Sequence, residues 1–289
     1  MTDDSNPPIL DHALSEPSAF TAEKLMDDVR RSRKVPNGTV PLICILEFDG
    51  DLTDWLVREG IAERFEPWAC FHTSMFTMNL EGIACGIIPR TIGGPYAVLI
   101  AEQLQAAGVN LIVGLTSAGR VAPDLPVPCL VVATSAIRDE GTSYHYIPPS
   151  TEVVCPSPIV PILEHELKAT GWPVRAGRVW TTDAPYRETK VQLMNWASEG
   201  VLAVEMQAAS LFAFGIARQV PVACVAMVSN AIDHTGDQFD TGSQEDGLSI
   251  VRGILRAVRS CKLTSSSHPR FAAGVILTRT SKCLFSNDL

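Results

Sequence analysis

Positive charge is scarce in this chain. Its 289 residues include 23 lysines and arginines against 32 aspartates and glutamates, which gives a formal net charge of −9. Binding to nucleic acid or to an anionic membrane surface requires clustered lysine and arginine. The charge balance therefore argues against both as main partners and favours a small polar ligand.

Long apolar runs are also absent. No run reaches the roughly 18 residues that a membrane-spanning helix requires. Residues 1–20 are polar and acidic, without the basic start and apolar centre of a secretory signal. We therefore expect a soluble, cytoplasmic protein.

The cysteines lack the paired spacing of a zinc site or a redox motif. None of the eight forms a C-x-x-C pair, and most lie inside apolar runs. This usage is typical of buried free thiols in a reducing compartment, so we expect no disulfide framework, no metal and no cofactor. The eight are Cys44, Cys70, Cys85, Cys129, Cys155, Cys224, Cys261 and Cys283.

The chain divides into three parts by composition. Residues 1–39 are expected to be a weakly ordered leader with one helical patch over 22–33, and residues 261–289 form a tail. Residues 40–260 hold most of the apolar material, and 46% hydrophobic residues suffice for one large core. We expect a single domain over 40–260.

Apolar runs and helical segments alternate through that domain. Because several runs lack alternating polarity, we expect an α/β fold whose central, mostly parallel, twisted sheet is covered by helices on both faces. Ligands of such sheets bind at the carboxyl ends of the strands. The expected strands are 40–46, 82–88, 109–115, 128–135, 175–181, 201–204 and 220–228, and the expected helices are 51–60, 95–107, 158–170, 189–198, 208–218 and 245–259.

The run Val204-Glu205-Met206-Gln207-Ala208-Ala209 precedes an apolar helix. A carboxylate and a carboxamide two residues apart can accept hydrogen bonds from sugar hydroxyls. The ordinary alternative is a solvated first turn of the helix. The run resembles the V-E-M-E-[AS]-A signature of the nucleoside phosphorylase and nucleosidase superfamily, with Gln207 in place of the second glutamate.

Further segments resemble the same superfamily in the order it requires, over about residues 40–258. The resemblance implies a phosphorylase-like fold, a site at strand ends with Gly50, Gly93, Ser117 and Met206 around sugar and acceptor, and a homo-oligomer, either a dimer or a hexamer. The segments are Gly50-Asp51, Ile92-Gly93-Gly94-Pro95, Thr116-Ser117-Ala118-Gly119, Arg138 to Tyr144 and Thr182 to Glu188.

Three arginines that hold phosphate in the superfamily are missing. The resemblance places them at Asp54, at Gly114 and near Phe71. A guanidinium–phosphate contact contributes about 1.5–3 kcal/mol, so their joint loss weakens phosphate binding severely. Arg90 and Arg120 are near enough in sequence to replace them, or they are ordinary exposed arginines.

The Thr116 to Gly119 loop is similar to that of the hydrolytic nucleosidases, which use water. That reaction also needs a carboxylate base near the first loop. Glu47, Asp49 or Asp51 could serve, and the alternative is a solvated acidic turn.

The leaving base must be stabilised as the glycosidic bond stretches. Asn230 stands where the purine enzymes carry an aspartate, which favours a pyrimidine or a base that leaves unprotonated; Asp233 and His234 either substitute or belong to a polar lid. After Tyr186, Arg187 can donate to base carbonyls and Glu188 can accept from a ring N–H, as an oxopurine or uracil-like edge requires. The alternative is a structural ion pair between Arg187 and Glu188.

The leading interpretation is cleavage of a nucleoside N-glycosidic bond, with phosphate as nominal acceptor and possible co-substrate. Glu205, Gln207 and Asn230 are the candidate catalytic residues. The loss of charge at Gln207 suggests tolerance of 2′-deoxy or other modified sugars. Two alternatives stay open: a hydrolytic nucleosidase, and a nucleoside-binding protein without turnover.

Overall fold

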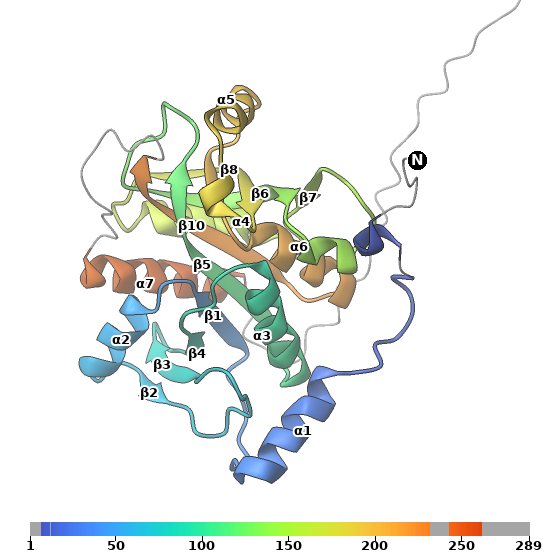
Figure 1. Cartoon of the computed structure of the whole chain (residues 1–289). Coiled ribbons are helices and arrows are strands. Elements are labelled where there is room, and N and C mark those ends of the chain that lie inside the picture. Colours follow the sequence, from blue (N-terminus) through green and yellow to red (C-terminus); the bar gives the residue numbers. More distant parts are fainter. Residues whose placement is uncertain (1–6, 12, 232–242, 262–289) are drawn as a thin grey trace, which may run out of the picture.

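Ten strands form one sheet at the centre of the computed structural model, which describes residues 7–11, 13–231 and 243–261 (Figure 1). The strand order is β10-β6-β8-β9-β5-β1-β4-β3-β2, and β7 pairs with β6. The strands are β1 (Ile43–Glu47), β2 (Glu63–Arg64), β3 (Phe76–Leu80), β4 (Ile83–Ile88), β5 (Leu111–Arg120), β6 (Cys129–Asp139), β7 (Glu152–Val154), β8 (Val174–Thr182), β9 (Ala203–Glu205) and β10 (Val222–Ala231).

One half of the sheet closes on itself. β10 pairs with β6 at one end of the order and also with β5, so β5, β9, β8, β6 and β10 form a ring. The long strand β5 makes this possible, because it pairs with β1 near its start and with β9 at its end. The carboxyl ends of β1, β5 and β10, which run parallel, therefore lie together.

The sheet is mixed rather than mostly parallel. Among the ten pairings of the described residues, β1–β4, β1–β5, β5–β10, β6–β8 and β8–β9 are parallel, and the other five are antiparallel. The expectation rested on apolar runs without alternation, which report burial on both faces of a strand. Burial does not fix strand direction, and β10 and β6 are both apolar yet antiparallel.

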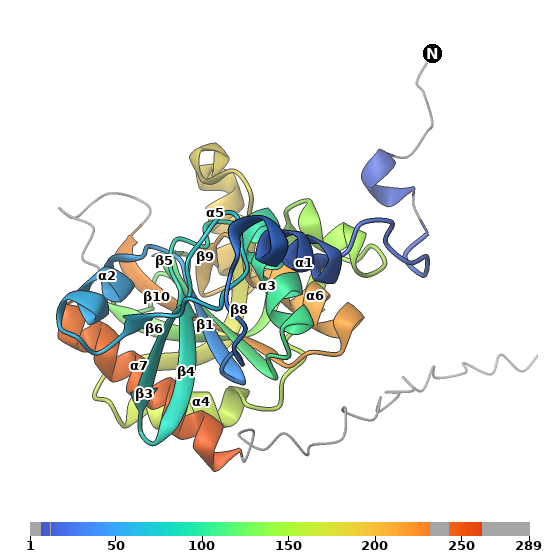
Figure 2. The same cartoon turned by 90° about the horizontal axis from the view of Figure 1, so that it is seen from below.

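Helices cover both faces of the sheet (Figure 2). α3 and α6 pack on one face with α1, whereas α4 and α7 pack on the other with α2. The helices are α1 (Ala22–Arg33), α2 (Asp51–Arg58), α3 (Gly94–Ala106), α4 (Val160–Lys168), α5 (Lys190–Ser198), α6 (Ala208–Arg218) and α7 (Gln244–Ser260), with short 3-10 turns η1 (Pro8–Leu10), η2 (Thr142–His145) and η3 (Pro185–Arg187).

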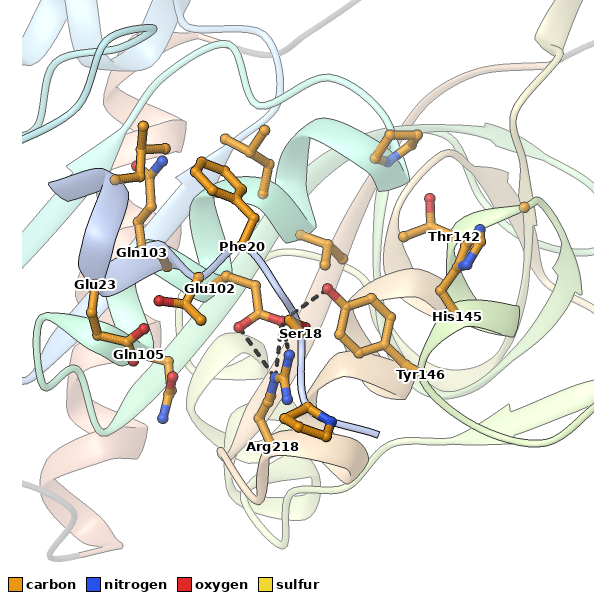
Figure 3. A pocket seen from close by; sticks show the side chains of 18 of the residues that line it. Ser18, Phe20, Glu23, Glu102, Gln103, Gln105, Thr142, His145, Tyr146 and Arg218 are labelled. Atoms are coloured by element: carbon orange, nitrogen blue, oxygen red, sulfur yellow. Dashed lines mark hydrogen bonds and ion pairs between the residues drawn. The ribbon is translucent and has the colours of Figure 1, made fainter. Parts of the chain in front are cut away.

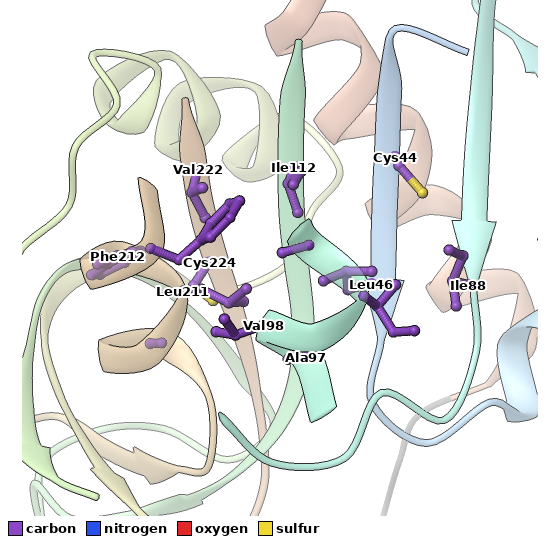
Figure 4. Close-up of a cluster of buried hydrophobic side chains, with 14 of the residues drawn as sticks. Cys44, Leu46, Ile88, Ala97, Val98, Ile112, Leu211, Phe212, Val222 and Cys224 are labelled. Atoms are coloured by element: carbon purple, nitrogen blue, oxygen red, sulfur yellow. The ribbon is translucent and has the colours of Figure 1, made fainter. Parts of the chain in front are cut away.

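The core between the sheet and the first helix layer is continuous (Figure 4). Val98 of α3 and Leu211 and Phe212 of α6 pack over Ile112 of β5 and Val222 of β10, and all five are at most 2% exposed. Burial of such side chains contributes about 1.5–3 kcal/mol each, so this layer holds the strand ends and helix starts in fixed positions.

The helical patch expected in the leader is α1, and it packs into the same core. Thr21 caps the helix by accepting a hydrogen bond from the Lys24 N–H, and Met26 and Val29 are 2% and 1% exposed. In the described part of the chain, no helix is long and apolar enough to cross a membrane.

Candidate active site

The first loop of the candidate site is built on a buried carboxylate. Glu47, the last residue of β1, accepts from the backbone N–H groups of Gly50, Leu52 and Thr53 at 2.9, 2.9 and 3.0 Å, and from the Thr53 hydroxyl. Burial raises the pKa of this carboxyl, and the hydrogen bonds partly offset the rise. Because both oxygens hold the start of α2, Glu47 is a structural cap and not a free base.

Asp49 joins this loop to the end of β5. It accepts a hydrogen bond from the Ser117 hydroxyl, and partial loss of water raises the pKa of its carboxyl. Asp49 also lines a small cavity of about 50 Å³ with Asp51, Thr116 and Ser243. A void of this size has room for one or a few waters beside these polar residues, while the rest of its wall is largely apolar.

Arg90 reaches the same loop from the other side. Its side chain lies against Gly50, where a Cβ would be 2.7 Å from the Arg90 Cγ; the φ angle of Gly50 is +98°. Its guanidinium forms an ion pair with Asp54, with Nη1 3.3 Å from Oδ1. Arg90 thus places a positive charge beside the loop. Asp54, which stands where the resemblance places an arginine, neutralises that charge.

A second glycine turn meets the Val204 to Ala209 run. Gly93 adopts φ +82° immediately before α3, and a Cβ there would lie 4.0 Å from the Met206 Cε. Met206 is only partly buried. Gly93 and Met206, over 100 residues apart in the numbering, therefore form one wall of the site.

Glu205 is not part of a solvated turn. It is 3% exposed, accepts from the Thr181 hydroxyl at 2.5 Å, and accepts from the backbone N–H groups of Gln207 and Ala208 at 2.7 and 2.9 Å. Burial raises its pKa to about 7 against these hydrogen bonds. Glu205 holds the start of α6, at the helix end that favours negative charge.

Gln207 occupies the space that Gly114 leaves. Its side chain is fully buried, and neither amide atom has a hydrogen-bond partner within the described residues. A Cβ at Gly114 would be 3.2 Å from the Gln207 Nε2 and 2.6 Å from the Cys224 Sγ. The two positions at which the resemblance places an arginine and a glutamate, Gly114 and Gln207, are therefore neighbours in space. Neither position carries a charge in this chain.

Three further residues predicted to bind substrate follow β8 in sequence. Tyr186 is 100% exposed and Arg187 is exposed, while Glu188 is half-buried with a pKa raised to about 7 by burial. No ion pair joins Arg187 to Glu188, although both are described. Their roles at the site stay predictions.

The last strand of the site is described only in part. The backbone of Asn230 lies on β10 in register with Gly119, while Asp233 and His234 lie outside the described residues. Arg120 ends β5 in register with Ala203, and none of the ion pairs found between described residues includes it.

A buried polar network beneath the site has no role assigned from sequence. Arg138 is 4% exposed and donates to Ser143, Ser150 and the Pro148 carbonyl. Glu140, 7% exposed, accepts from the Ser210 hydroxyl at 2.5 Å, beside the start of α3.

This network joins the starts of α3 and α6. The signal for it was present as the charged run Arg138-Asp139-Glu140 at the end of an apolar stretch, because buried charges must be hydrogen-bonded.

A larger cavity of about 1000 Å³ lies between the leader and α3 (Figure 3). Glu102 stands in its wall and accepts from the Tyr146 hydroxyl at 2.9 Å and from the Arg218 Nε at 2.9 Å. Neither the Gly50 loop nor Ser117 lines this cavity. Pro95, Thr142 and Asp183 do line it, so the cavity borders segments of the candidate site.

The sequence profile of the phosphorylase superfamily matches residues 51–258, which is most of the chain. The chain belongs to this superfamily. The profile begins at α2 and ends in α7, so it spans the later loops described above, whereas α1 and residues 47–50 of the first loop precede it.

Curated relatives agree on the family and differ in substrate. The chain is 29% identical over 217 residues to a uridine phosphorylase of Treponema pallidum, covering 70% of this chain and 84% of that protein. It is 27% identical over 227 residues to a guanosine phosphorylase of Halorubrum lacusprofundi, covering 74% and 94%. An uncharacterized protein of Acanthamoeba polyphaga mimivirus is 29% identical over 162 residues, covering 56% of this chain and 63% of that protein.

No cluster of three or more histidine, cysteine, aspartate or glutamate side chains suited to a metal ion occurs in the part of the superfamily domain that the structure describes.

Proposed function

We propose that this chain cleaves the N-glycosidic bond of a nucleoside and transfers the sugar to water rather than to phosphate. The observation that carries the choice of acceptor is the charge of the first loop. Asp49, Asp51 and Asp54 surround it, and Arg90, the cation beside it, is paired with Asp54. A phosphate dianion would meet net repulsion there.

Water meets a suitable environment in the same place. The small cavity beside Asp49 has the size for a bound water, and Asp49, Asp51, Thr116 and Ser243 supply polar groups within a largely apolar wall. The Asp49 carboxyl has a raised pKa, which makes it a stronger base than an ordinary aspartate, and the Ser117 hydroxyl fixes its position.

In the proposed reaction, the water oxygen attacks the anomeric carbon of the sugar. The bond between that carbon and the base nitrogen breaks, and its electron pair leaves with the base. Asp49 takes the proton from the water, and the base receives a proton from solvent. Met206 and Gly93 form the wall against which the sugar packs.

The choice of base depends on the residues expected to face it. Arg187 and Glu188 offer one donor and one acceptor for an oxopurine or pyrimidine edge, and Asn230 provides no acid. Arg187 is exposed and Glu188 is half-buried in the free protein. A homo-oligomer and a cytoplasmic location remain predictions, and sedimentation of the purified protein tests the first.

The test measures release of free base from a panel of purine and pyrimidine nucleosides, with and without phosphate, and chromatography of the sugar. Equal release in both conditions with free sugar supports the proposal. Phosphate-dependent release with a sugar 1-phosphate overturns water as acceptor. Binding without release, seen by thermal shift, overturns catalysis altogether and favours a binding protein.

Asp49→Asn removes the base while keeping the hydrogen bond to Ser117. We expect kcat to fall by about 100-fold or more, in the range that general-base catalysis contributes. Asp28→Asn, an equal change of charge on the exposed face of α1, is the control and keeps full activity. Unchanged kcat in Asp49→Asn would exclude this residue as the base.

A further inference from the structure

A pocket whose charged side chains are mainly basic, in contrast to the acidic first loop, lies between the C-terminal end of α1 and residues 64–74. Its volume is about 390 Å³, within the range of small-molecule sites. Arg33, Lys34, Arg64 and His72 line it, with Glu66 as the single carboxylate. It shares no lining residue with the acidic cavity at Asp49. A concentration of basic side chains is unexpected in a chain with a net charge of −9.

Arg33 is held in place without a carboxylate partner among the described residues. Its guanidinium carbon lies 4.6 Å from the centre of the Phe71 ring, and its Nη1 donates to the Cys70 carbonyl at 3.4 Å. The neighbouring Arg30 and Arg31 are instead paired with Asp27 and Asp28. Arg33 therefore presents a fixed positive charge with donors to spare.

Trp68 forms part of the pocket wall and is 6% exposed. Its indole N–H has no hydrogen-bond partner in the described structure, and because that atom is itself buried, it is not available to a ligand in the pocket. The hydroxyls of Thr73 and Ser74 line the same pocket.

We propose that this pocket binds a small phosphomonoester. The phosphate accepts hydrogen bonds from Arg33 and Lys34, which are donors without acceptor function. The volume exceeds that of phosphate alone, and Phe65 and Phe71 add aromatic surface for an organic group. Arg33 and Lys34 precede the segment that matches the superfamily, whereas residues 64–74 lie within it, so the pocket joins the leader to the domain.

The test is calorimetric titration of the full-length protein with uridine 5′-monophosphate, ribose 5-phosphate, inorganic phosphate and uridine. We expect both phosphomonoesters to bind more tightly than phosphate, and uridine to give no signal from this pocket. Tighter binding of the nucleotide than of the sugar phosphate would identify a ring-stacking ligand, and equal binding a sugar phosphate; both support the site.

Variants locate the binding. Arg33→Gln should weaken it at least about tenfold, because one charge-assisted contact is lost. Arg31→Gln, on the same helical turn, and Arg90→Gln, at the acidic loop, should leave it unchanged.

Three results would overturn the proposal. They are equal weakening by Arg31→Gln and Arg33→Gln, loss of binding in Arg90→Gln, and the absence of phosphomonoester binding to the intact protein. The inference does not depend on the proposed reaction, because its readout is binding alone.

Discussion

At the residue scale, the unusual feature is the buried amide of Gln207 beside Gly114. An arginine cannot occupy position 114 in this packing, because even a Cβ there would be 2.6 Å from the Cys224 sulfur. The amide that fills the space makes no hydrogen bond within the described residues. A buried amide without hydrogen bonds lowers the free energy of unfolding, so we expect Gln207 to serve function and not stability.

We therefore expect Gln207→Met to stabilise the free protein and to damage function. The change keeps the volume and removes two unpartnered polar atoms, which should raise the free energy of unfolding by about 1–3 kcal/mol. If the amide meets the sugar when substrate enters, kcat/KM should fall on both uridine and deoxyuridine. Urea unfolding and steady-state kinetics measure the two effects.

Gln103→Met is the matched control for that experiment. Gln103 is 2% exposed, and its Oε1 likewise has no partner among described residues, but it lies in α3 away from the Gly50 loop. It should gain stability without losing activity. A loss of stability in Gln207→Met would mean instead that an internal water satisfies the amide.

At the scale of a single element, α6 depends on one carboxylate for its start. Glu205 has a pKa of about 7 in the folded protein, above its ordinary value of 4.5. Between these two values the folded state retains a proton that the unfolded state has lost. Stability should therefore fall as pH rises from about 4.5 to about 7, by up to about 1.4 kcal/mol per pH unit, and should level off above.

Glu205→Gln should remove this component of the pH dependence. The free energy of unfolding, measured by urea at steps from pH 5 to pH 8, should decline less in the variant than in the parent. A residual slope is expected from Glu188, whose pKa is also raised to about 7. Glu199→Gln, exposed at the end of α5, is the control; equal slopes in all three proteins would contradict the assignment.

At the scale of the whole molecule, the leader is joined to the domain through α1. Met26 and Val29 lie in the same core cluster as α3 and α6, although α1 precedes the segment matched by the superfamily. Arg33, the last residue of this helix, and Lys34, its C-cap, are two of the cations of the basic pocket. The attachment of α1 thus brings these two cations beside residues 64–74 of the superfamily domain.

Met26→Ala should lower the free energy of unfolding of the whole domain by about 2–5 kcal/mol, as expected for a buried methionine. Lys24→Ala, exposed on the same helix, should change it by less than about 0.5 kcal/mol. Thermal unfolding followed at two wavelengths checks that a single transition remains. A separate early transition for Met26→Ala would show that α1 is attached only loosely.

Much of the fold was accessible from sequence, because apolar runs and helix signals are local. The helices expected at 208–218 and 245–259 correspond to α6 (Ala208–Arg218) and α7 (Gln244–Ser260). The strands β2, β3 and β7 were missed, because they are short or carry polar residues such as Thr77 and Asn79. Their pairing depends on neighbours in the sheet, which no local pattern contains.

By itself, the sequence determined the family, the alternation of strands and helices and the absence of arginine from the expected positions, since these depend on residue identity and order. Only the tertiary structure decided that Arg90 meets Asp54, 36 residues away, that Gln207 lies against Gly114, and that Glu47 and Glu205 are structural caps. Contacts of this kind follow from strand register and helix packing. They are set by the whole core together, so no single segment specifies them.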